Sequence, residues 1–110
     1  MSTTNTVLIP SKIAVATDTT QYTSTGVTTI IDKFTAYNYD SVTRSISVNL
    51  VAAGDTVGNK NLMKTASILA GQSYQFPEVV GHTLEAGGYI STKASNATGI
   101  TIRSSGRKLT

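Results

Sequence analysis

Threonine constrains the fold of this chain more than any other feature of its sequence. The 110 residues include 19 threonines and 12 serines. Threonine is β-branched, so it suits a pleated, half-solvated strand and is poorly suited to helix interiors. Charged residues make up only 14% of the chain, whereas ordinary soluble domains contain roughly 25%. We therefore expect an all-β protein whose surface is covered mainly by hydroxyl groups.

Alternation of apolar and polar residues supports this expectation, and it is clearest over residues 44–52. Ile46, Val48 and Leu50 are apolar, and the residues between them are polar. A period of two predicts a strand with one buried face and one solvated face.

A longer extended run covers residues 27–39. Asp32 and Lys33 interrupt its apolar residues, which predicts a bulge or a bend at that point. The expected faces are Ile30, Phe34 and Ala36 on one side, and Ile31, Thr35, Tyr37 and Tyr39 on the other.

Clusters of turn-forming residues divide the chain into about seven or eight strands, with no convincing helix. This spacing is typical of a single antiparallel β-sandwich with either an immunoglobulin-like or a jelly-roll topology. The sequence predicts an N-terminal arm over residues 1–10 and one sandwich domain over residues 11–110. A domain of this size can bury roughly two-thirds of its unfolded surface, so one core suffices without disulfides. The chain contains no cysteine.

Residues that could perform catalysis or hold a metal are few and scattered. His82 is the only histidine, and without cysteines it cannot build a typical zinc site. The six carboxylates show no paired or calcium-loop spacing, and there is no phosphate-binding loop or nucleophile elbow. We expect no enzymatic activity and no cofactor. No apolar segment is long enough to span a bilayer, and the first residues lack the pattern of a secretory signal.

Two small groups of residues are candidates for an interface. Tyr37 and Tyr39 are expected on one face of a strand, where they could either pack against the sheet or anchor a partner. Arg103, Arg107 and Lys108 form the one basic cluster of a chain with a net charge of +3. Because these cations do not alternate with the tyrosines along the sequence, a nucleic-acid surface is not favoured.

Four segments carry a resemblance to small β-sandwich structural proteins of tailed bacteriophages. They are residues 31–38 (IDKFTAYN), 45–51 (SISVNLV), 68–73 (ILAGQS) and 77–90 (PEVVGHTLEAGGYI). The resemblance spans about residues 27–107. It implies a virion component without catalytic residues, located in the virus particle and bound to the major capsid protein or to other virion proteins.

A capsid decoration or cement protein that stabilises the phage head, present as a homo-oligomer, is the expected role. A neck or tail accessory protein fits the same residues. A carbohydrate- or nucleic-acid-binding β module is the alternative from another class, and it depends on Tyr37, Tyr39 and the basic cluster.

Overall fold

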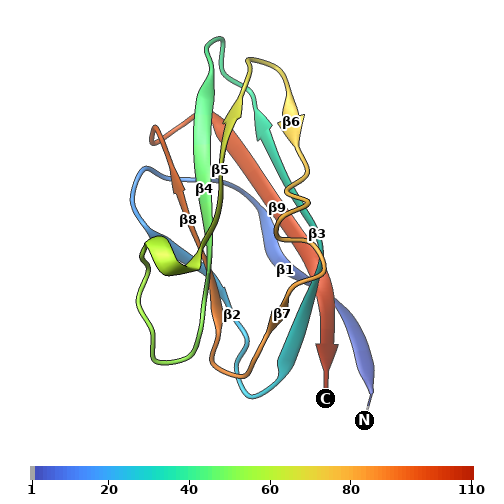
Figure 1. Ribbon diagram of the computed structural model, residues 1–110. Helices are drawn as coiled ribbons and strands as arrows, with labels where there is room; N and C mark the ends of the chain where they lie inside the picture. Colours follow the sequence, from blue (N-terminus) through green and yellow to red (C-terminus); the bar gives the residue numbers. More distant parts are fainter. Residues whose placement is uncertain (1) are drawn as a thin grey trace.

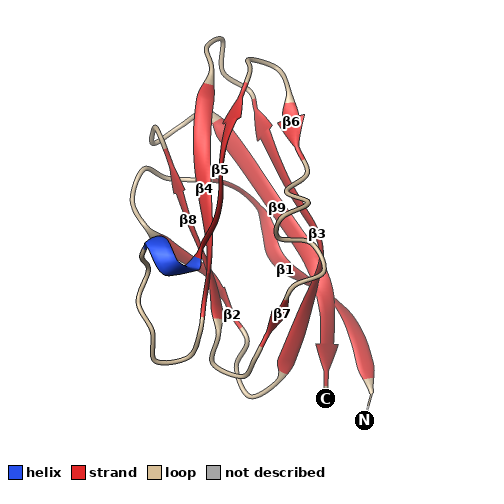
Figure 2. Cartoon of the chain, in the orientation of Figure 1, coloured by secondary structure: helices blue, strands red, loops and turns tan. Residues whose placement is uncertain are grey.

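Residues 2–110 of the computed structural model form two antiparallel β-sheets packed face to face (Figure 1). Sheet A contains, in spatial order, β1 (Thr3–Ile13), β9 (Ile100–Leu109), β3 (Thr28–Asn38) and β6 (Ser73–Tyr74), and β7 (Thr83–Leu84) also pairs with β3. Sheet B contains β2 (Thr19–Thr23), β8 (Tyr89–Ala94), β4 (Arg44–Val51) and β5 (Leu62–Ile68). The only helical element in this range is a short 3-10 turn, η1 (Asn59–Asn61), seen in Figure 2.

The expected all-β sandwich is confirmed, and its strand order distinguishes the two expected topologies. The chain changes sheet after β1, β2, β3, β5, β7 and β8, and only β4 and β5 form a long hairpin within one sheet. In an immunoglobulin sandwich the last two strands share a sheet, whereas here β8 and β9 lie in different sheets. Since β6 and β7 both pair with β3, they act as one interrupted strand. The order is then that of an eight-stranded jelly roll.

The bulge predicted at Asp32 and Lys33 is present in β3. The register between β3 and β9 shifts between Ile31 and Lys33, and the extra residue reverses which alternate positions face the core. Ile31 is buried before the bulge and Phe34 is buried after it. The prediction that Ile30 shares a face with Phe34 is therefore wrong, because a period of two does not continue through a bulge.

Residues 3–10 do not form a separate arm, and Met1 lies outside the described residues. Residues 3–10 make up most of β1, eight of whose eleven residues have a register partner in β9. Leu8 and Ile9 are both buried, since register shifts on either side of Ile9 interrupt the alternation. Because the alternation is interrupted, the sequence of these residues does not predict a strand. The pairing is also not predictable locally, because the partner strand β9 lies at the other end of the chain. A single domain therefore spans the described residues.

The core lies between the sheets and contains two phenylalanines. Phe34 and Phe76 pack edge to face with ring centroids 5.0 Å apart, and Tyr74 packs on Phe76 at 4.9 Å. Phe76 adopts a φ of 48°, which a non-glycine residue rarely does. This conformation turns the chain out of β6, and the Phe76 ring is fully buried there.

Candidate interaction surface

The two outer faces of the sandwich carry different side chains. On sheet B, Ser45 pairs with Ser67, and Ser47 pairs with both Thr65 and Lys93. The hydroxyl groups of Ser47 and Thr65 are 2.9 Å apart and share a hydrogen bond. This face is therefore mainly a ladder of hydroxyl groups, as expected for a solvated surface.

The outer face of sheet A is more apolar, and Tyr37 lies at one end of it. Thr101 of β9 pairs with Tyr37 of β3 on one side and with Ile13 of β1 on the other. Tyr37 and Ile13 are 43% and 45% exposed. Tyr39 follows directly after β3, where its backbone N donates to the Gly99 carbonyl at 2.9 Å, and it is 47% exposed. These three large side chains thus lie at the same end of sheet A and remain open to a partner.

Two arginines extend this face along β9. Arg103 pairs with Thr35 and is exposed. Arg107 lies four residues further along, and its Nε donates to both carboxylate oxygens of Asp32 at 3.1 and 2.9 Å. The Asp32 carboxylate raises the pKa of Arg107 through this hydrogen bond and its negative charge. Lys33 and Arg103, in contrast, make no ion pair with any described residue.

Lys108 does not belong to this face. Side chains alternate along a strand, so Lys108 points to the opposite side of sheet A from Arg107. It pairs there with Thr4 and Thr29. The basic cluster predicted from the sequence is therefore divided between two faces, because neighbours in a strand sequence are not neighbours on a sheet surface.

The structure brings Tyr37, Tyr39, Arg103 and Arg107 together, and it adds residues that sequence reasoning missed. We call this surface the tyrosine–arginine face, and its members are Val7, Ile13, Lys33, Tyr37, Tyr39, Arg103 and Arg107. Val7 was missed because residues 1–10 were expected to form an arm, and Ile13 was missed because the sequence does not show that β1 pairs with β9. Lys33 joins the face because bulged residues point to the same side as the residue opposite them, here Ser105.

A shallow hollow of about 440 Å³ lies beside the Arg107–Asp32 pair. It is lined by Asn5, Thr6, Val7, Asp32, Ser105 and Gly106. The β9 residues that line it, Ser105 and Gly106, are small. A projecting side chain of a partner could enter it.

A buried asparagine stabilises the backbone at the end of the face where the two tyrosines lie. Asn38 lies between Tyr37 and Tyr39 and is fully buried. Its Nδ2 donates to the carbonyl oxygens of Val42 and Ile68, both at 2.8 Å, and its Oδ1 accepts from Asp40 N at 2.9 Å. The Asn38 side chain thus fixes the β3–β4 loop against β5.

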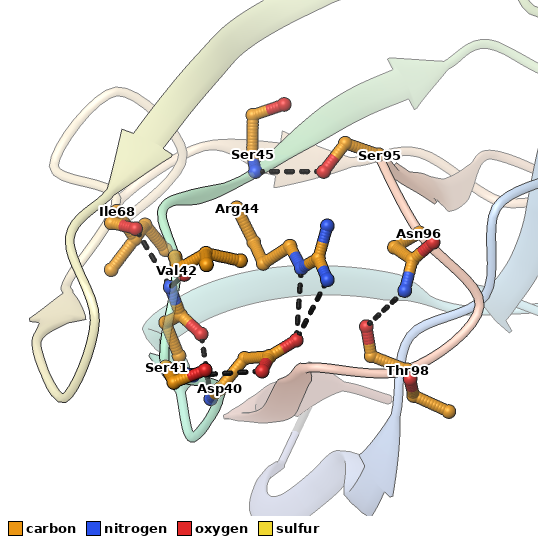
Figure 3. A network of polar contacts seen from close by, with 10 residues as sticks. Asp40, Ser41, Val42, Arg44, Ser45, Ile68, Ser95, Asn96 and Thr98 are labelled. Atoms are coloured by element: carbon orange, nitrogen blue, oxygen red, sulfur yellow. Dashed lines mark hydrogen bonds and ion pairs between the residues drawn. The ribbon is translucent and has the colours of Figure 1, made fainter.

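An ion pair between Asp40 and Arg44 also stabilises this loop (Figure 3). Arg44 Nε and Nη2 lie 3.0 and 2.9 Å from Asp40 Oδ2, and Ser41 N donates to Asp40 Oδ1 at 2.7 Å. The Ser41 amide and the Arg44 guanidinium hold the pKa of Asp40 below its ordinary value of 3.8.

Low pH should reduce the stability that Asp40 contributes to the β3–β4 loop. A carboxyl with a lowered folded pKa contributes stability above its unfolded pKa, and this contribution is lost as the pH falls through the folded pKa. For Asp40 the loss therefore begins near pH 3.8 and continues below it. We expect the melting temperature of the Asp40→Asn variant to depend less on pH than that of the unsubstituted protein. Thermal melts between about pH 2 and about pH 5 check this, and identical slopes would contradict it.

The titratable groups elsewhere are dispersed. Within residues 2–110 no three His, Cys, Asp or Glu side chains lie close enough to hold a metal ion. His82 precedes β7 and is exposed, and its carbonyl accepts from Ile31 N at 3.0 Å. Glu78 accepts hydrogen bonds from the Tyr74 hydroxyl, which lower the pKa of Glu78 and raise that of Tyr74. This pair joins β6 to the turn that follows it.

Comparison of the chain with protein-family models, with curated proteins and with solved structures gives no match. No helix in the described range is long and apolar enough to cross a membrane. The contrast between the two outer faces is therefore the main structural clue to function.

Proposed function

We propose that this chain is a non-enzymatic structural protein of a virus particle that docks on a neighbouring virion protein through the tyrosine–arginine face. The most specific version of this proposal is that the chain is a capsid decoration or cement protein that stabilises the head of a tailed phage. The observation that carries the proposal is the asymmetry of the sandwich. One outer face is a hydroxyl ladder, and the other presents tyrosines, aliphatic side chains and arginines.

The composition of the tyrosine–arginine face supports docking on a protein. Tyrosine and arginine are enriched at the energetically dominant positions of protein interfaces. Tyr37 and Arg103 lie on strands rather than on loops, so little backbone conformational entropy is lost when a partner binds. The face also combines apolar area with few free charges, which favours a protein over a polyanion that needs many cations.

The fold and the sequence pattern support a place in a virion. Jelly rolls build viral capsid domains and also lectins, although a fold alone does not define a function. The four segments that resemble phage structural proteins include residues 31–38 of β3 and residues 45–51 of β4. A neck or tail accessory protein would use the same face, and copy number separates the two roles. Hundreds of copies per particle indicate the capsid, and about a dozen indicate the neck or tail.

A pair of matched charge reversals tests the docking face. Arg103→Glu changes an exposed cation on the tyrosine–arginine face, and Lys93→Glu makes the same change in charge on the outer face of sheet B. The purified proteins are titrated onto undecorated capsids of the phage whose genome encodes the chain. We expect Arg103→Glu and Tyr37→Ser each to weaken binding about 30-fold, the effect of losing roughly 2 kcal/mol at a hot spot. Lys93→Glu should bind like the unsubstituted protein.

Four outcomes would overturn the proposal. The first is a gene that lies outside any phage or prophage, and the second is the absence of saturable binding to capsids or to purified neck and tail assemblies. The third is salt-sensitive binding to single-stranded DNA that Arg103→Glu abolishes, which would indicate a nucleic-acid-binding module. Binding to a glycan array that depends on Tyr37 would indicate a carbohydrate-binding module in the same way.

A further inference from the structure

The free edge of sheet A consists of two unlike halves. The second half of β1 contains Pro10 and Lys12, and register shifts interrupt it on either side of Ile9. Proline, lysine and bulges are the usual means by which proteins prevent edge strands from pairing with other chains. The first half, Thr3–Val7, has none of them: it is uncharged, and its five residues pair with β9 without a shift.

The hydrogen bonds of β1 show which backbone groups of this segment are free. Ser2 N donates to Thr110 O at 2.8 Å, and Thr110 N donates to Ser2 O at 2.9 Å. The register continues unchanged to Val7. In an antiparallel ladder such bonded pairs alternate with non-bonded ones, so Thr4 and Thr6 bond to β9. The N–H and C=O groups of Thr3, Asn5 and Val7 therefore point away from β9, along the open edge.

This open edge is accessible. Thr3, Thr4, Asn5 and Val7 are exposed, and Thr6 is partly exposed. Figure 1 shows the starting end of β1 at the outer edge of the molecule, beside the final end of β9. The other edge strands of the two sheets are less suited to pairing with another chain. β2 is five residues long and contains a register shift, β6 and β7 have two residues each, and the regular part of β5 includes Lys64.

We propose that two copies of this chain pair through Thr3–Val7 as antiparallel strands related by a two-fold axis at Asn5. In this register Thr3 of one copy faces Val7 of the other, and the two Asn5 residues face each other. These are the residues whose backbone groups point outward, so each of the three pairs can exchange two hydrogen bonds. The pairing is self-complementary, as a two-fold interface requires.

The side chains and charges fit a second copy of the same chain. On one face the two Asn5 amides meet, and Val7 meets Thr3; on the other face Thr4 meets Thr6. Cross-strand threonine pairs are favourable in sheets, and no like charges face each other within the segment. The nearest cation on the outer face is Arg107 of β9, which is the register partner of Asn5 and already binds Asp32. The dimer joins two copies of sheet A into one sheet, with both tyrosine–arginine faces on the same side.

The inference is independent of the virion proposal, and the protein alone suffices to test it. Sedimentation equilibrium measures the mass over a range of chain concentrations up to millimolar. We expect the mass to rise toward twice the 11.5 kDa of one chain. Asn5→Lys places two like charges on the two-fold axis and should weaken dimerisation at least about tenfold. Thr20→Lys, which adds the same charge to the exposed edge of sheet B, should have no effect.

Asn5→Pro removes an outward-facing N–H without removing a bond to β9, so it should also yield a folded monomer. Amide hydrogen exchange gives a readout that does not depend on any variant. In the dimer, the amides of Thr3, Asn5 and Val7 should exchange more slowly as the concentration rises, whereas those of Thr4 and Thr6 should be protected at every concentration. A protein that stays monomeric would overturn the proposal. So would a dimer that survives Asn5→Lys and Asn5→Pro, or one that leaves the Asn5 amide unprotected.

Discussion

Replacing Gly106 with alanine should destabilise this protein by about 3 kcal/mol or more, a large share of the roughly 5–15 kcal/mol that stabilises a typical domain. Gly106 is buried in β9, the strand between β1 and β3. A Cβ at this position would collide with the carbonyl oxygen of Ile30 and lie 2.9 Å from Leu8 Cδ1. The carbonyl belongs to the backbone of β3, so it cannot move aside without disturbing the pairing of β3 with β9.

Gly58→Ala is the matched control. Gly58 has an extended φ of −172°, which any residue adopts, and apart from its two chain neighbours no residue has an atom within 4 Å of a Cβ built there. Its replacement should change stability by no more than about 0.5 kcal/mol. Urea denaturation of the two variants and the unsubstituted protein measures the difference. Similar midpoints for the two alanine variants would show that β3 can move away from β9, contrary to the expectation.

Replacing Asn38 with alanine should cost about 3–5 kcal/mol. The Asn38 side chain makes three hydrogen bonds to the backbone groups of Val42, Ile68 and Asp40. Alanine would leave these backbone groups without their partner and create a cavity. Each unsatisfied buried group costs about 1–3 kcal/mol, and loss of a buried network is one of the few changes that exceed the usual effect of a single substitution.

Asn96→Ala is the control for this second prediction. Asn96 makes one hydrogen bond, to Thr98 O at 3.3 Å, in an exposed turn next to the same loop. Its loss should change stability by no more than about 0.5 kcal/mol. Denaturant unfolding provides the comparison, and near-ultraviolet circular dichroism reports on the order around Tyr37 and Tyr39. An Asn38→Ala protein as stable as Asn96→Ala would mean that the carbonyls find other partners, and the account of this network would be wrong.

The two proposals reinforce each other without depending on each other. A dimer through Thr3–Val7 would place two tyrosine–arginine faces side by side, so one dimer could contact two neighbouring subunits of an assembly. Linking two binding sites in this way raises the overall affinity without any new contact in each site. A monomer could still dock through a single face, and a dimer could still form in solution if the docking partner proved to be different.

Much of the fold was predictable because its signals are local. The strand over residues 44–51 alternates apolar and polar residues, and the side-chain period of a strand is a property of the backbone itself. The bulge in β3 was predictable because Asp32 and Lys33 interrupt an apolar run. The strand character of β5 and the turn at Gly71, whose φ is +72°, follow from similar short-range preferences.

The interaction surface was only partly predictable, because it combines strands that are distant in the sequence. Tyr37 and Arg103 were singled out, but nothing in the sequence places β9 beside β3. The Arg107–Asp32 pair joins residues 75 positions apart. Lys108 was grouped with Arg107 because the two are adjacent in sequence, and the pleat of the strand separates them. Ile13 and Val7 entered the face only when β1 paired with β9.

The sequence by itself determined the class of the protein: an all-β chain rich in threonine, with alternating strands, one histidine and no cysteine. These features depend on the preferences of single residues and their immediate neighbours. The tertiary structure alone decided the jelly-roll order, the conversion of the expected arm into β1, and the gathering of the tyrosine–arginine face. The physical reason is that β pairing is non-local. The residue opposite a given strand position is set by packing and register across the whole chain, and a bulge of one residue in β3 is enough to exchange its buried and exposed faces.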